Sequence, residues 1–202
     1  MAVRASEILD RIALAADAPS DIKIVSEQAH HVSARERLLD TQMGPGRRRK
    51  SSEALRRGCR PAEGLAFAAV DGKGALVGTV RLWNVAAGIG QDGRPVPALL
   101  LGPLAVDSTS EGCGIGSLLI SHAIEKARQL GHGAIILVGD APYYGRFGFS
   151  ADFTGALAMP GPVERSRFLA IELVDNHLSG VAGVLVATGR PASARRWFRL
   201  AA

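Results

Sequence analysis

The alternation of apolar and polar positions along the chain predicts one central sheet with helices inserted between its strands. Apolar runs typical of strands occur at 22–25, 65–70, 75–85, 97–106, 134–138 and 168–174. Apolar repeats at helical spacing, or start and stop signals, predict helices at 27–43, 51–57, 114–130 and 142–146. Because the strands are mostly sequential, this order favours an α/β or α+β class with one sheet.

The helix expected at 114–130 has the clearest pattern. Its apolar side chains recur on one side at helical spacing, and Gly131 is typical of a helix end. That side, which we expect to be buried, consists of Ile115, Leu118, Leu119, Ala123, Ile124, Ala127 and Leu130.

The strand expected at 97–106 is nearly all apolar, as is usual for a central strand buried on both faces. Gly102-Pro103 lies in its middle, and proline has no N–H to donate to a neighbouring strand. We therefore expect a bulge or a splay at this point. A loop at 87–96 is expected to precede the strand.

The length and composition indicate one compact domain. The chain has 202 residues and 47% apolar content, enough for a substantial core. We expect a helical extension at 1–20, a main domain at 21–180, and a C-terminal strand with a basic tail at 181–202. The extension is interrupted by charges and lacks the apolar stretch of a signal peptide or membrane span. With two cysteines far apart, this predicts a cytoplasmic protein that binds no membrane.

The chain carries 24 basic and 19 acidic residues, a net charge of +5 that favours anionic ligands. The densest basic run, Arg47-Arg48-Arg49-Lys50, follows Gly44-Pro45-Gly46 and is typical of a solvated turn. Because no aromatic residues alternate with it, we expect no nucleic-acid partner. Metal-ligand spacing is absent, and we expect no metal.

A glycine-rich turn opens the long helix. Gly112, Gly114 and Gly116 leave the backbone open to an anion, and the first N–H groups of a helix have no partner within it. The helix dipole adds roughly half a positive charge at the same end. The turn therefore predicts a phosphate site, although a tight turn that binds nothing fits the spacing equally well.

Two other phosphate-binding motifs fit less well. A dinucleotide fold places its glycines after the first strand, whereas this turn lies past the middle of the chain. The loop of nucleotide triphosphatases needs Lys-Ser or Lys-Thr after its last glycine. Gly116 is followed here by Ser117-Leu118, which excludes that loop.

A second motif follows the strand expected at 134–138. It reads Gly139-Asp140-Ala141-Pro142-Tyr143-Tyr144-Gly145-Arg146-Phe147-Gly148-Phe149 and places two tyrosines in a short helical turn. Together with 100–106 and 112–116, it resembles the GNAT superfamily of N-acetyltransferases, in particular the YhbS-like branch. The resemblance runs roughly from Ile22 to Val174.

The resemblance implies a single GNAT-like domain at 21–180, with a mixed, mostly antiparallel sheet that is splayed at the fourth strand and flanked by helices. It implies acetyl-coenzyme A as cosubstrate and transfer of the acetyl group to an amine by direct attack. The family's tyrosine that protonates the leaving thiolate maps onto Tyr144, which suits general acid catalysis, and Tyr143 is assigned to packing. The implied cosubstrate contacts are Leu104, Ala105, Val106, Glu111, Gly112, Cys113, Gly114, Ile115, Gly116 and Ser117.

Two residues of the glycine-rich turn depart from the family pattern. The family's loop usually begins with Gln or Arg and often has another Arg two positions later, whereas this chain has Glu111 and Cys113. A carboxylate next to a pyrophosphate repels it unless the side chain turns to solvent. A catalytically weakened acyl-coenzyme A-binding or regulatory domain is therefore the alternative function.

The sequence indicates the general base and the acceptor substrate less clearly than the cosubstrate site. Asp140 is a candidate general base, although an aspartate before Ala-Pro is more commonly a turn cap. Trp83 is a candidate for the substrate entry, although an aromatic residue on a strand more often belongs to the core. The acceptor is either a small-molecule amine or a protein amine. The oligomeric state is open, with a homodimer among the options.

Overall fold

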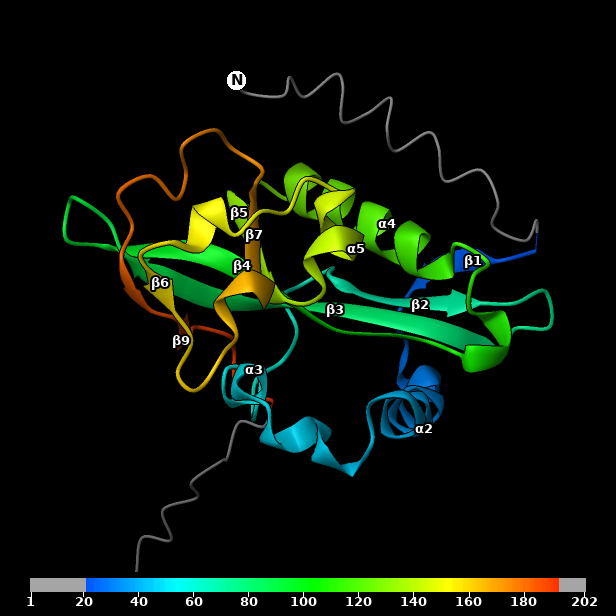
Figure 1. The fold of residues 1–202 in the computed structure, drawn as a ribbon. Helices are drawn as coiled ribbons and strands as arrows, with labels where there is room; N and C mark the ends of the chain where they lie inside the picture. Colours follow the sequence, from blue (N-terminus) through cyan, green and yellow to red (C-terminus); the bar gives the residue numbers. More distant parts are fainter. Residues whose placement is uncertain (1–20, 193–202) are drawn as a thin grey trace, which may run out of the picture.

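The computed structural model describes residues 21–192, in which a mixed sheet forms the centre of the molecule (Figure 1). Its seven strands are β1 (Lys23–Ser26), β2 (Ala66–Val70), β3 (Leu76–Ile89), β4 (Pro95–Val106), β5 (Ala134–Val138), β7 (Phe168–Glu172) and β9 (Val186–Ala187). Their order is β1-β2-β3-β4-β5-β7, with β9 beside β3. β4 and β5 are parallel and the other pairs are antiparallel, so the predicted mixed, mostly antiparallel sheet is confirmed.

Helices cover both faces of this sheet (Figure 1). α4 (Ile115–Gln129) and α5 (Ala141–Gly145) lie on one face, and α2 (Val32–Met43) and α3 (Ser51–Ala54) lie on the other. A small second sheet pairs β6 (Leu157–Ala158) with β8 (Gly183–Val184). Short 3-10 turns are η1 (Ala29–His31), η2 (Pro45–Arg49), η3 (Ser108–Ser110), η4 (Asp152–Thr154) and η5 (Arg165–Arg167). The extension expected at 1–20 and the end of the basic tail at 193–202 lie outside the described residues.

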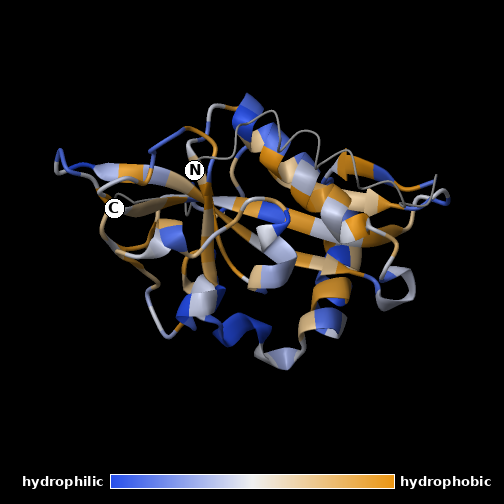
Figure 2. Ribbon diagram, turned by 45° about the horizontal axis from the view of Figure 1, so that its top comes forward, coloured by the Kyte–Doolittle hydropathy of each residue, from blue (hydrophilic) through white to orange (hydrophobic). Residues whose placement is uncertain are grey.

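The sheet has a core on each face because successive side chains of a strand point to opposite sides. On β4, Leu99 and Leu101 pack with α4, whereas Ala98 and Leu100 belong to the apolar cluster of the opposite face. All four are buried, as predicted for a central strand. Figure 2 shows the same arrangement as hydrophobic colour along the central strands and hydrophilic colour in many of the connecting turns.

Helix α4 buries most of its predicted apolar side. The fully buried members are Ile115, Leu119, Ala123, Ile124 and Ala127. Ile120 is also fully buried, although the pattern did not include it. The prediction is wrong for Leu130, which is 46% exposed because it follows the last helical turn, where the chain reverses at Gly131 (φ 79°).

Half of the loop expected at 87–96 is strand. β3 continues to Ile89 and β4 begins at Pro95, with these two residues paired across the hairpin. The cause is a tertiary contact, since Val85 and Ala86 pair with β9 on the other edge of β3. Because β9 lies much later in the chain, the sequence of the hairpin itself does not indicate this pairing.

The helix expected from Glu27 begins five residues later, at Val32. The Glu27 N–H donates to the carbonyl of Ala66 at 2.8 Å, which prolongs the pairing of β1 with β2. The Glu27 carboxylate also pairs with Arg35 and Arg81. These contacts hold residue 27 in an extended conformation.

The helix expected at 51–57 ends early, at Ala54. Leu55 is buried in the core under the sheet, and Gly58 has φ +74°, a conformation that ends helices. The strand expected at 168–174 similarly ends at Glu172. Within residues 21–192, no helix combines the length and the apolar character needed to cross a lipid bilayer.

Replacing Leu119 with alanine tests the packing of α4 on the sheet. Leu119 is fully buried, so we expect the variant to lower the free energy of unfolding by about 2–5 kcal/mol. The matched control is Leu130→Ala, because Leu130 is largely exposed and its loss is expected to cost less than about 0.5 kcal/mol. Urea denaturation followed by circular dichroism measures both, and equal effects would contradict the burial of α4.

Candidate functional site

A bulge interrupts β4 at the centre of the sheet. Leu101 lies opposite Leu82 and Leu104 lies opposite Val80, so Gly102 and Pro103 together face a single residue of β3. This confirms the irregularity predicted for Gly102-Pro103. A bulge of this kind bends the strand and re-aims its neighbours.

Beyond the bulge, β4 loses its second neighbour. The pairing of β4 with β5 covers Leu99 and Leu100. Residues 101–106 therefore pair with β3 on one edge only, and their other edge has no partner strand among the described residues. This edge includes the predicted cosubstrate contacts Leu104, Ala105 and Val106, and it leaves backbone groups free for a ligand.

Trp83 supports the bulge with a hydrogen bond. Its Nε1 donates to the carbonyl oxygen of Gly102 at 2.5 Å, and the side chain is 6% exposed. The structure thus places Trp83, the candidate for the substrate entry, in the core. An indole in a core needs an acceptor for its N–H, and the distorted strand supplies one.

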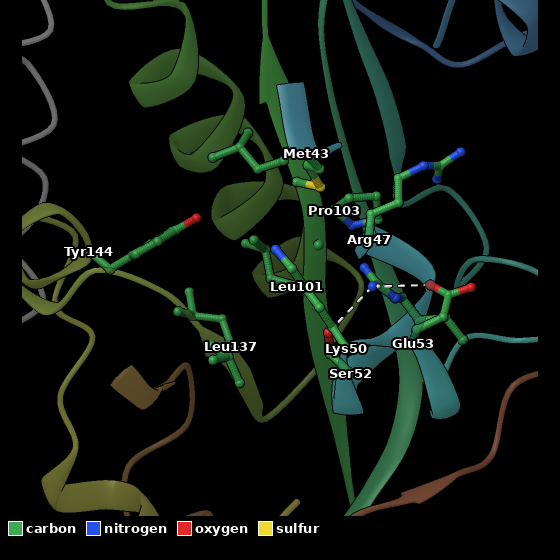
Figure 3. A pocket seen from close by; sticks show the side chains of 13 residues that line it. Met43, Arg47, Lys50, Ser52, Glu53, Leu101, Pro103, Leu137 and Tyr144 are labelled. Atoms are coloured by element: carbon green, nitrogen blue, oxygen red, sulfur yellow. Dashed lines mark hydrogen bonds and ion pairs between the residues drawn. The ribbon is translucent and has the colours of Figure 1, made fainter. Parts of the chain in front are cut away.

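A cavity of about 110 Å³, called here the central cavity, passes through the gap beside the bulge. Figure 3 shows Tyr144 entering from α5 on one side, and Glu53 and Arg47 from the opposite side of β4. Its lining residues are Met43, Arg47, Lys50, Ser52, Glu53, Arg56, Leu101, Gly102, Pro103, Leu104, Leu137, Val138 and Tyr144. The cavity therefore joins both faces of the sheet.

Tyr144 is seated against the end of β5. A methyl group added at Gly139 would lie 2.2 Å from the Tyr144 ring, so the ring needs a glycine there. Burial raises the pKa of Tyr144 well above its usual value, with a smaller contribution from Tyr143 and an opposing one from Arg167. A phenol of ordinary pKa, about 10, is already protonated at neutral pH, and the raised pKa of Tyr144 extends its acid form to higher pH.

Asp140 caps helix α5. Its carboxylate accepts a hydrogen bond from the Tyr143 N–H at 3.2 Å, and it does not belong to the lining of the central cavity. The carboxylate that the fold brings to this cavity is that of Glu53. Sequence reasoning missed Glu53 because its segment carries no motif, and only the packing of α3 against the bulge reveals it.

The glycine-rich turn forms a second cavity of about 320 Å³, called here the loop cavity. Gly112 (φ 80°) and Gly114 (φ 74°) adopt left-handed conformations that favour glycine, and no side chain caps α4. Its lining residues are Val106, Ser110, Glu111, Gly112, Gly114, Ile115, Gly116, Ser117, Tyr143 and Arg146. The first N–H groups of α4 are thus left for an external acceptor.

Gly116 and Tyr143 meet inside the loop cavity. A methyl group at Gly116 would lie 2.6 Å from the Tyr143 hydroxyl, so only a glycine allows this approach. Tyr143 therefore borders the loop cavity as well as packing against Tyr144, with the ring centroids 5.1 Å apart. Cys113, also predicted as a contact, is half-buried and packs against the core.

Arg146 and Glu111 bring one charge of each sign to the loop cavity. Both side chains line the loop cavity, and Arg146 stacks over the ring of Tyr143 at 4.6 Å from its centroid. Sequence reasoning missed Arg146, although it stands inside the second motif, two residues after Tyr144. The loop cavity thus combines free amides and one cation with one carboxylate.

Within residues 21–192, no group of three or more His, Cys, Asp or Glu side chains is arranged to hold a metal ion.

Comparison with known proteins gives consistent matches. Residues 33–149 match the sequence model of the Acetyltransferase (GNAT) family. The chain is 29% identical over 121 residues to YhbS of Escherichia coli K12, named an uncharacterized N-acetyltransferase, and the match covers 60% of this chain and 70% of YhbS.

Solved structures agree with this match. The crystal structure of Escherichia coli YhbS in complex with CoA superposes with a TM-score of 0.70 at 26% identity, covering 84% of this chain and 91% of that chain. A GNAT family acetyltransferase from Brucella melitensis, in complex with acetyl-CoA, has the same fold with a TM-score of 0.53 at 23% identity, covering 74% and 95%.

Replacing Trp83 with phenylalanine tests the support of the bulge. The variant keeps an aromatic ring in the core but leaves the Gly102 carbonyl without its donor. We expect the free energy of unfolding to fall by about 1–3 kcal/mol, the cost of an unpaired buried acceptor. Urea denaturation checks this, and a stability equal to that of the wild type would contradict the assigned role.

Proposed function

Since this chain belongs to the acetyltransferase (GNAT) family, we propose that it transfers an acetyl group from acetyl-coenzyme A to an amine by direct attack, with Tyr144 as the general acid. One observation carries the proposal: the unpaired edge of β4 runs between the loop cavity and the central cavity that contains Tyr144. The CoA complex of the similar YhbS structure supports the choice of cosubstrate.

The residues present fit coenzyme A along this edge. The amides opening α4 and the side chain of Arg146 suit the pyrophosphate. The free backbone groups of Leu104, Ala105 and Val106 suit the amides of the pantetheine arm. When bound, acetyl-coenzyme A supplies a thioester whose carbon–sulfur bond breaks as the amine nitrogen bonds to the acetyl carbon.

The reaction then requires two proton transfers that involve side chains of the protein. Tyr144, whose raised pKa keeps its hydroxyl protonated, donates its proton to the departing sulfur. The amine must give up a proton to become an amide, and Asp140 is occupied as the cap of α5. We assign this proton to Glu53, directly or through water, because its carboxylate lines the same cavity as Tyr144.

A second candidate function is a domain of the same fold that binds acyl-coenzyme A without effective turnover. Glu111 favours it, because this exposed carboxylate borders the cavity that would receive the pyrophosphate. Isothermal titration with acetyl-coenzyme A, followed by an acetyl-transfer assay against a panel of primary amines, separates the two functions. Binding with no acetylated product would support the second.

Replacing Tyr144 with phenylalanine tests the general acid. We expect kcat to fall about 10²–10⁴-fold, with the Kd for coenzyme A changing less than about twofold. The comparison variant is Tyr143→Phe, whose effect should appear in that Kd, since its hydroxyl lies beside Gly116 in the loop cavity. A wild-type kcat in Tyr144→Phe would rule out the assigned role.

The same assignment predicts the pH profile of kcat. Because the pKa of Tyr144 is raised, its acid form is present below that pKa and persists to higher pH than an ordinary phenol of pKa about 10. The wild-type kcat should therefore show no fall attributable to loss of this proton below pH about 10. A descending limb near pH about 8 that disappears in Tyr144→Phe would contradict this.

Opposite charge changes test the electrostatics of the loop cavity. We expect Glu111→Gln to tighten the binding of coenzyme A about two- to fivefold, and Arg146→Gln to weaken it by a similar factor. Both effects should shrink at high salt, because the side chains are exposed. Calorimetry measures the Kd for coenzyme A of both variants. The control is Glu63→Gln, an exposed charge outside the loop cavity. If both variants changed the Kd in the same direction, this would contradict a pyrophosphate bound at this loop.

A further inference from the structure

Arg56 is a buried cation that the acetyl-transfer chemistry does not use. It lines the central cavity, and its side chain is only 9% exposed. Its Nη2 contacts Glu53 Oε2 at 3.2 Å and Ser52 Oγ at 3.4 Å. Burial lowers the pKa of Arg56, but an arginine keeps its charge at neutral pH.

The rest of this guanidinium is unsatisfied by the described residues. The buried Nε–H donates to no acceptor among them. Nη1 likewise has no hydrogen bond within residues 21–192, and it lies 3.6 Å from the position that a side chain would occupy at Gly102. A buried donor without an acceptor is costly, and Nη1, next to the bulge, is the part of the guanidinium that an oxygen from outside the chain can approach.

The charges around Arg56 also favour an anion. The charged residues lining the central cavity are Arg47, Lys50 and Arg56 against Glu53 alone. Arg47 is already paired with Asp40 and Glu36, each at 2.6 Å. Lys50 forms no ion pair with any residue between 21 and 192, so Arg56 and Lys50 together exceed the charge of Glu53.

We propose that Arg56 binds a carboxylate of the acceptor, so that the substrate class is amines that carry a carboxylate near the reacting nitrogen. The planar guanidinium matches a carboxylate, and Glu53 beside it matches the ammonium group of the same molecule. This inference rests on the proposed function only in naming the bound molecule as the acceptor. The carboxylate site itself is independent of turnover.

A carboxylate fits better than a phosphate. Glu53 lies within 3.2 Å of Arg56 and repels a dianion more strongly than a monoanion. A cavity of about 110 Å³ also favours the smaller group. The position of Arg56 beside Gly102 then brings the amine of the acceptor towards the edge of β4 and Tyr144.

The test titrates wild-type protein with two probes that differ only in this group, N-acetylglycine and N-acetylglycinamide. The readout is the proton–nitrogen NMR signal of Arg56 Nε, assigned by its absence in Arg56→Lys. We expect a saturable shift with N-acetylglycine and binding of N-acetylglycinamide at least about tenfold weaker, as for loss of a charged hydrogen bond. Equal responses to both probes, or no saturable shift at millimolar concentration, would overturn the proposal.

Variants of Arg56 and a third probe test the proposal further. Arg56→Lys and Arg56→Gln should abolish the preference for N-acetylglycine, measured by thermal shift, whereas Arg57→Gln should keep it because Arg57 is exposed and outside the cavity. If Arg56→Gln does not fold, the wild-type titration decides alone. Tighter binding of inorganic phosphate than of N-acetylglycine would overturn the choice of a carboxylate. Calorimetry with acetyl-coenzyme A reports separately on the proposed function, so each can fail without the other.

Discussion

The hydrogen bond from Trp83 to the carbonyl of Gly102 supports the feature on which the site depends. It holds a bulge at the point where β4 stops pairing with β5. A regular ladder there would satisfy every backbone group of β4 and close the gap between the strands. The irregularity instead leaves one edge of the strand open, and both cavities border that edge.

The two cavities differ in the polar and charged groups that line them. The loop cavity combines the backbone amides that open α4 with Arg146 and Glu111, one charge of each sign. The central cavity relies on side chains, with Arg56 and Glu53 held close together under the bulge. That pair suits a small molecule carrying both charges. Tyr144 lines the central cavity, and burial raises its pKa.

The candidate site could be predicted only in part. The glycine-rich turn and Tyr144 were found from sequence, and the structure places each of them at a cavity. Asp140 and Trp83 were also singled out, but the first caps α5 and the second lies in the core. Their alternative roles, a turn cap and a core aromatic, were visible from residue type alone.

The local sequence was enough to predict most of the strands and helices, the glycine-rich start of α4 and the interruption of β4, because each depends on neighbouring residues. Which side chains share the central cavity depends on how distant segments pack together. Glu53 of α3 and the following Arg56 line the same cavity as Tyr144, beside a bulge formed much later in the chain. Contacts between distant segments depend on strand register and helix docking, and no local pattern encodes them.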